Sequence, residues 1–447
     1  MFLGLAAAAG GAAARSPAPP AAIDVRVELD RPLLPAGSTE TVVVKVALDG
    51  QRLPRAGRLP VNLALVIDKS GSMTGEKIAR ARQAALAAVD RLASDDVVAL
   101  IVYDSEVMTL VPARPVGDGQ ALRSAIHRLG ANGGTNLHGG VVAGAAELHR
   151  YLENNYLHRV ILLSDGQANV GPSSPHELGL LGARLQSQGI SVTTIGLGLD
   201  YNEDLMTRLA RRSDGNTYFV ADSAALPGIF QRELGDVLDV VARRLIVEVR
   251  FSDGVRPVRV VGRDGRVEGD RGIFELNQMY AGQEKFALFE VELTTGSHGG
   301  GCEIASASVR YDDRHGNTLT TTSARVRAEF TRHDRDVIAA ANHRVQADYA
   351  TNRFAETKDE VVELVDAGRR SEAAERLRLV ADSLNKVAST YHNVAVAKVA
   401  APAPAEAERV ELEGLDSARR KTYRAEAQQT YHQQRSSEPS GSSSASD

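Results

Sequence analysis

Three short polar segments carry oxygen atoms that suit a hard metal ion. The first, residues 68–72, reads Asp-Lys-Ser-Gly-Ser, so a carboxylate and two hydroxyls occupy alternate positions directly after an apolar run. The second, Gly-Gly-Thr-Asn at 133–136, adds a hydroxyl, and the third, Ser-Asp-Gly at 164–166, adds a carboxylate. Mg²⁺ prefers such oxygen ligands in nearly octahedral geometry and keeps several waters. We therefore predict one divalent-cation site with five ligands: Asp68, Ser70, Ser72, Thr135 and Asp165.

The elements that must position these side chains are those of a parallel α/β sheet. Between residues 61 and 244, short apolar runs alternate with longer amphipathic segments, a pattern typical of strands covered by helices on both faces. The carboxyl ends of parallel strands meet at one edge of a sheet, where ligands bind, so Asp68 and Asp165 are expected to lie close together. The strands that we predict are Val61–Ile67, Val97–Tyr103, Arg159–Leu163 and Ser191–Leu197.

The two flanks of this region alternate apolar and polar residues with a period of two, as strands do. We expect residues 23–60 and 245–330 to form a single β-sandwich into which the α/β domain of residues 61–244 is inserted; two separate β modules are the alternative. Residues 331–435 show helical spacing and predict a hairpin followed by a polar helix over 406–434. The Ser/Gly-rich residues 436–447 are too polar to bury and are expected to be disordered.

The run Val61–Met73, together with Gly134-Thr135-Asn136 and Leu163–Gly166, resembles the first strand and metal loops of von Willebrand factor type A (VWA) domains of bacterial proteins. More distant architectural relatives are the inter-alpha-trypsin inhibitor heavy chains and the calcium-activated chloride channel regulators. The resemblance implies a Rossmann-like α/β fold with a mostly parallel sheet. It also implies that the five oxygen ligands above form a metal-ion-dependent adhesion site for Mg²⁺ or Mn²⁺; Ca²⁺ suits oxygen ligands as well.

A cation held by five protein ligands keeps one position open, which an Asp or Glu of a partner protein can fill. The function predicted is therefore metal-dependent protein–protein interaction, in adhesion or as a scaffold. The alternatives are an accessory subunit of an ATPase-driven, chelatase-like or channel complex, and an envelope protein whose metal only stabilises the fold. Surrounding loops would supply specificity, and their candidate partner-binding residues are Glu106, Asn132, Asn169 and Asn202.

Other function classes lack their signals. His176-Glu177 begins like a zinc-protease helix, but Leu180 stands where the second histidine belongs, and no nucleophile elbow or Walker loop occurs, so we expect no enzyme. The formal net charge of −5, without a basic run, argues against nucleic-acid binding. The single cysteine, Cys302, excludes disulfides within the chain.

The location of the protein depends on its first 22 residues, which include an alanine-rich apolar segment and a Pro/Ala-rich linker. We interpret this segment as a signal for export to the periplasm or the cell exterior, although it lacks a basic start; without export the protein would be cytoplasmic. No other apolar run is long enough to span a bilayer.

Overall fold

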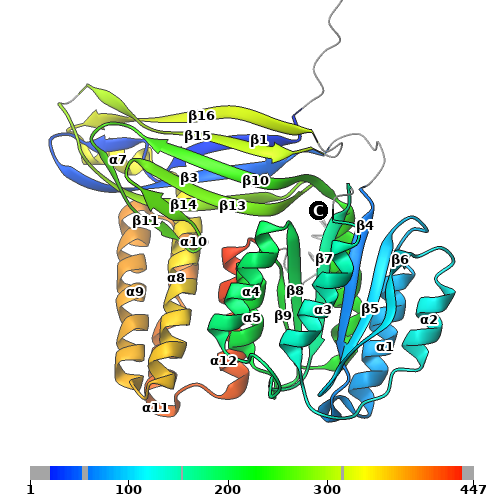
Figure 1. Cartoon of the computed structure of the whole chain (residues 1–447). Coiled ribbons are helices and arrows are strands. Elements are labelled where there is room, and N and C mark those ends of the chain that lie inside the picture. The colour runs from blue at the N-terminus through cyan, green and yellow to red at the C-terminus, as the bar shows by residue number, and fades with distance from the viewer. Residues whose placement is uncertain (1–20, 53–58, 153–154, 298, 314–316, 435–447) are drawn as a thin grey trace, which may run out of the picture.

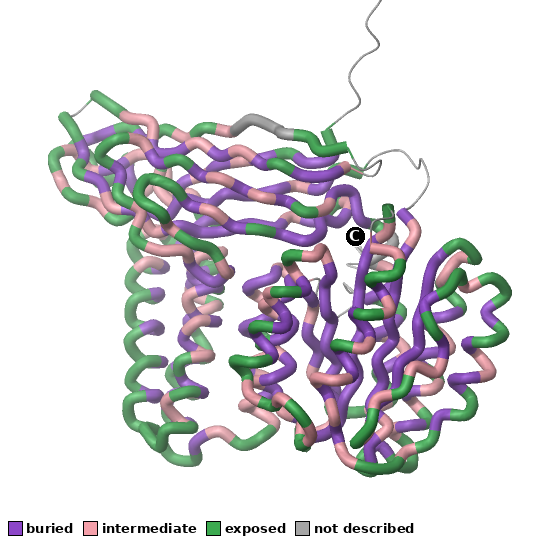
Figure 2. The backbone as a smooth tube through the Cα atoms, viewed as in Figure 1, coloured by how far each residue is buried: buried purple, intermediate pink, exposed green. Residues whose placement is uncertain are grey.

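The α/β domain is built on a six-stranded sheet with the order β6-β5-β4-β7-β8-β9, in which only β6 is antiparallel to its neighbour. Every residue of the central strands β4, β5, β7 and β8 is buried, as Figure 2 shows by continuous stretches of one colour. The mostly parallel α/β fold predicted from the sequence is therefore confirmed. The strands are β4 (Val61–Asp68), β5 (Val97–Tyr103), β6 (Val107–Pro115), β7 (Leu157–Ser164), β8 (Ile190–Leu197) and β9 (Thr217–Val220).

Helices cover both faces of this sheet. One face packs against α1 (Glu76–Val89), α2 (Gln120–His127) and α6 (Leu226–Leu238), and the other against α3 (Leu137–His149), α4 (Pro175–Ser187) and α5 (Glu203–Arg212). Short 3₁₀ turns, η1 (Gly71–Met73) and η2 (Ser223–Ala225), lie before α1 and α6.

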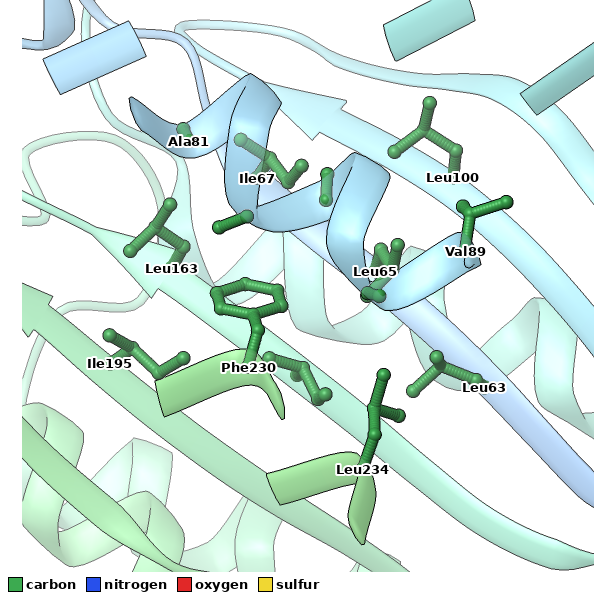
Figure 3. Close-up of a cluster of buried hydrophobic side chains, with 14 of the residues drawn as sticks. Leu63, Leu65, Ile67, Ala81, Val89, Leu100, Leu163, Ile195, Phe230 and Leu234 are labelled. Atoms are coloured by element: carbon green, nitrogen blue, oxygen red, sulfur yellow. The ribbon is translucent and has the colours of Figure 1, made fainter. Parts of the chain in front are cut away.

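Small side chains bring the helices close to the strands. Figure 3 shows Ala81 of α1 near Ile67, with Phe230 and Leu234 of α6 in the same cluster. On the opposite face, a Cβ atom at Gly140 of α3 would lie only 2.7 Å from the Tyr103 ring. These close contacts between helices and strands support the loops that follow the strand ends.

The sandwich combines strands from both flanks of the α/β domain. One sheet has the order β1-β3-β14-β11 and the other β12-β13-β10-β15-β16-β2. Strand β3 pairs with β14 from Thr39↔Thr294 to Asp49↔Glu284, so the single sandwich predicted from the sequence is confirmed. Its strands are β1 (Ile23–Leu29), β2 (Leu33–Pro35), β3 (Thr39–Gly50), β10 (Val240–Phe251), β11 (Val255–Val261), β12 (Arg266–Glu268), β13 (Arg271–Tyr280), β14 (Glu284–Thr294), β15 (Gly301–Asp312) and β16 (Thr318–Thr331).

In the part of the chain that the structure describes, six helices follow the sandwich: α7 (Asp334–Ala339), α8 (His343–Asp366), α9 (Arg370–Tyr391), α10 (Val394–Ala400), α11 (Ala403–Glu413) and α12 (Ser417–Tyr431). The single polar helix predicted over 406–434 is wrong, because the chain turns at Gly414, whose φ is +76°. Asp416 then caps α12 by accepting a hydrogen bond from the Arg419 amide. Helix α12 lies between α8 and the α/β domain, where it contacts α5 and β9 (Figure 1).

The computed structural model describes residues 21–52, 59–152, 155–297, 299–313 and 317–434. The predicted leader (1–22) lies outside these ranges except for its last two residues, and the predicted disordered tail (436–447) lies wholly outside them. Within the ranges, no helix has the length and apolar character needed to cross a membrane.

Candidate metal-ion site

Asp68 is the last residue of β4 and is fully buried. Its Oδ1 accepts a hydrogen bond of 2.8 Å from the Ser70 amide, and its Oδ2 accepts one of 2.7 Å from Ser164 Oγ. Burial raises the pKa of Asp68, an effect that the hydrogen bonds from Ser70 and Ser164 oppose. A cation beside this carboxylate would favour its ionised form, so the position suits a metal ligand.

The two serine hydroxyls lie on the loop and the 3₁₀ turn that follow β4. Ser70 Oγ and Ser72 Oγ are 3.0 Å apart, and Ser72 Oγ donates a 2.7 Å hydrogen bond to Asp165 Oδ1. The amide of Gly71 donates to the carbonyl of Gly133 at 3.0 Å, which fastens this loop to the loop that carries Thr135. Strand ends and loop contacts thus bring four of the five predicted residues together.

Thr135 is held in place by Asn169. The Thr135 amide donates to Asn169 Oδ1 at 2.8 Å, and the Thr135 carbonyl accepts from the Asn169 amide at 3.1 Å. Thr135 itself is buried, with 3% of its surface exposed. The sequence suggested Asn169 as a partner-binding residue, whereas its side-chain oxygen positions the Thr135 loop.

The three hydroxyls surround one small space. A Cβ atom at Gly166 would lie 3.1 Å from Thr135 Oγ1, 3.3 Å from Ser72 Oγ and 3.9 Å from Ser70 Oγ. Gly166 directly follows Asp165, so the space that this glycine leaves open is bordered by hydroxyls and lies next to a carboxylate. A set of hard oxygen donors around a small gap fits Mg²⁺ or Mn²⁺.

The donor set depends on hydroxyl oxygens. Across the described ranges, no three His, Cys, Asp or Glu side chains gather into a metal-binding group. A cation at this site would therefore bind through two carboxylates and three hydroxyls, directly or through water.

Lys77 is a member of the site that the sequence reasoning missed. It lies in the first turn of α1, and its Nζ donates to Asp165 Oδ2 at 2.6 Å. The signal available in the sequence was its place nine residues after Asp68, at the start of the helix that follows the metal loop. Ser164, which hydrogen-bonds Asp68, also has a role that the pattern alone did not assign.

The other residues suggested for partner binding differ in what their side chains do. Glu106 and Asn132 are exposed, and the Asn132 amide donates to the Lys69 carbonyl beside the metal loop. The Asn202 side-chain oxygen accepts hydrogen bonds from the amides of Asp204 and Leu205, so it caps α5. The Asn202 side-chain oxygen is therefore used to cap α5, whereas Glu106 and Asn132 lie at the surface.

Comparisons with known proteins agree with the resemblance noted in the sequence. Residues 62–232 match the family model of the von Willebrand factor type A domain. An uncharacterized protein of Synechocystis sp. is 28% identical over 305 residues, which cover 65% of this chain and 71% of that protein. Inter-alpha-trypsin inhibitor heavy chain H4 of Bos taurus is 28% identical over 252 residues, which cover 54% of this chain but only 26% of the heavy chain.

The solved structure of a von Willebrand factor type A protein from Catenulispora acidiphila has the same fold. It superposes with a TM-score of 0.64 at 19% identity, and the match covers 88% of this chain and 96% of that one. The similarity therefore extends beyond the α/β domain to the sandwich and helices.

Proposed function

Because residues 62–232 form a von Willebrand factor type A domain, a module that commonly mediates protein–protein interaction, we propose that this chain binds a partner protein through a divalent metal ion. The ligands are the two carboxylates and three hydroxyls at the strand ends. The observation that carries the proposal is the space beside Gly166, within 4 Å of all three hydroxyl oxygens.

Recognition follows from charge and coordination. The metal supplies a Lewis-acidic centre, and Asp68 and Asp165 bring only two negative charges to it. A position left to water can accept a carboxylate of an Asp or Glu on the partner. Any carboxylate would satisfy this contact, so exposed residues around the site, such as Glu106 and Asn132, select among partners. In this role the site binds a partner and catalyses no reaction.

Metal titration followed by peptide binding tests the proposal. Wild-type protein should bind Mg²⁺ and Mn²⁺ in calorimetry, and the Asp68→Ala variant should not. Asp90→Ala serves as a matched control, because Asp90 is an exposed carboxylate at the end of α1 that pairs with Arg123. It should bind metal like the wild type.

The second step uses arrayed peptides that contain one glutamate, each paired with the same peptide carrying glutamine. Wild type and Asp90→Ala should prefer glutamate peptides in Mg²⁺ and lose this preference in chelator. Equal binding of both peptide sets, or preference that survives in Asp68→Ala, would refute metal-dependent recognition.

A further inference from the structure

Lys77 places a positive charge directly behind one of the metal ligands. Its Nζ contacts Oδ2 of Asp165, whereas Oδ1 of the same carboxylate accepts the hydrogen bond from Ser72. The carboxylate thus lies between the hydroxyl-lined space and an ammonium group. Asp165 is fully buried, so solvent screens this arrangement only weakly on the carboxylate side.

The ammonium is also open to the surface. The Lys77 side chain keeps 30% of its surface exposed. Gly198 lies next to this ammonium, because a Cβ atom at Gly198 would lie 3.7 Å from Lys77 Nζ. Because this neighbour has no side chain, nothing from that position covers the ammonium, and the ammonium can attract an approaching anion.

The charge balance of the site depends on Lys77. Two carboxylates cancel the two charges of a divalent cation, so the ammonium leaves the loaded site with a net positive charge. The nearby Lys69 does not add to this charge, because it forms an ion pair with Asp104. A positive charge beside a metal opposes the binding of that metal and favours the binding of an anion to the complex.

We propose that Lys77 couples metal binding to partner binding: its ammonium beside Asp165 weakens the affinity for the metal alone and strengthens the affinity of the metal-loaded site for a partner carboxylate. This inference rests on the proposed metal-dependent function and adds a residue that controls it. Linkage requires the converse as well, so a carboxylate ligand must raise the affinity for the metal. Because Asp68 and Asp165 repel an anion from the empty site, the rise at a given ligand concentration depends on the carboxylate affinity of the loaded site, which Lys77 strengthens.

The test measures Mn²⁺ affinity by electron paramagnetic resonance, with and without acetate as the carboxylate probe. The Lys77→Gln variant should bind Mn²⁺ about tenfold more tightly without acetate, a moderate value because the lysine is partly exposed. Acetate should strengthen Mn²⁺ binding in the wild type and do so clearly less in Lys77→Gln. Lys77→Arg keeps the charge and should behave like the wild type in both measurements.

Arg80→Gln is the matched control, because it removes a positive charge from the same helix at a residue that pairs with Glu76 instead of the site. It should leave the affinity and the acetate effect unchanged. Unchanged or weaker Mn²⁺ binding in Lys77→Gln, or an equal effect of Arg80→Gln, would overturn the role of Lys77 while the proposed function stands. Failure of the wild type to bind Mn²⁺ at all would overturn both.

Discussion

Filling the space beside Gly166 should impair metal binding without unfolding the protein. The Gly166→Ala substitution adds one methyl group at the point on which Ser70, Ser72 and Thr135 converge. The φ of Gly166 is not positive, so its backbone lies outside the left-handed region. Alanine can therefore adopt this conformation, and the effect of the substitution comes from the added atom.

The size of the effect follows from the contacts that the methyl would make. Its distances of 3.1 Å to Thr135 Oγ1 and 3.3 Å to Ser72 Oγ are tighter than ordinary contacts, so both hydroxyls must move by a few tenths of an ångström. Changes that displace metal ligands without removing them typically cost about 10- to 100-fold in affinity. We expect a loss of at least about tenfold, which corresponds to about 1.4 kcal/mol.

Calorimetric titration with Mn²⁺ provides the measurement, and circular dichroism checks that the variant is folded. Gly130→Ala is the matched control, since Gly130 is exposed and a Cβ atom there would have no neighbour within 4 Å. If Gly166→Ala binds Mn²⁺ as tightly as Gly130→Ala does, the cation does not occupy the hydroxyl-lined space.

Three further predictions concern stability. Burial lowers the pKa of His158 to about 4, so its neutral form stabilises the fold above pH 6.5 and this contribution is lost as the pH falls towards 4. Between these pH values, the free energy of unfolding measured in urea should fall by about 3 kcal/mol more in the wild type than in His158→Gln. Equal losses would contradict this assignment. Lys421 is buried, pairs with Glu203 and donates a hydrogen bond to the Tyr201 carbonyl at 2.7 Å. Lys421→Met should therefore lower the free energy of unfolding by about 3 kcal/mol, measured as a lower urea midpoint. An unchanged midpoint would show that this residue does not anchor α12. Mg²⁺ at about a hundred times its dissociation constant should stabilise the wild type by about 2.7 kcal/mol in thermal unfolding. An equal gain in Asp68→Ala would place the ion elsewhere.

Local patterns were sufficient to predict the α/β domain and the position of the loop that carries the candidate ligands. Buried strands are continuous apolar runs, and the alternation of Asp68, Ser70 and Ser72 directly after such a run is visible in the sequence. Parallel pairing of β4 with β7 then brings Asp165 beside them, as the carboxyl-edge argument predicts. The structure brings these ligands together, and binding of the ion itself is the proposal to be tested.

The supporting residues could not be predicted, because their roles depend on contacts between distant elements. The sequence predicted partner binding for Asn169, whereas in the fold its side-chain oxygen accepts a hydrogen bond from the Thr135 amide. Lys77 reaches Asp165 across 88 residues of sequence. Lys421 lies on a helix of polar composition, yet it is buried against α5, where it pairs with Glu203, a residue 218 positions earlier in the sequence.

The most direct test of the metal site is a crystal structure of the protein grown with Mn²⁺, with anomalous diffraction to locate the ion. We expect an anomalous peak in the space beside Gly166, with the hydroxyls of Ser70, Ser72 and Thr135 around it and with Asp68 and Asp165 bound directly or through water. A crystal that contains Mn²⁺ at another place, with none among these five residues, would show that they do not form the metal site.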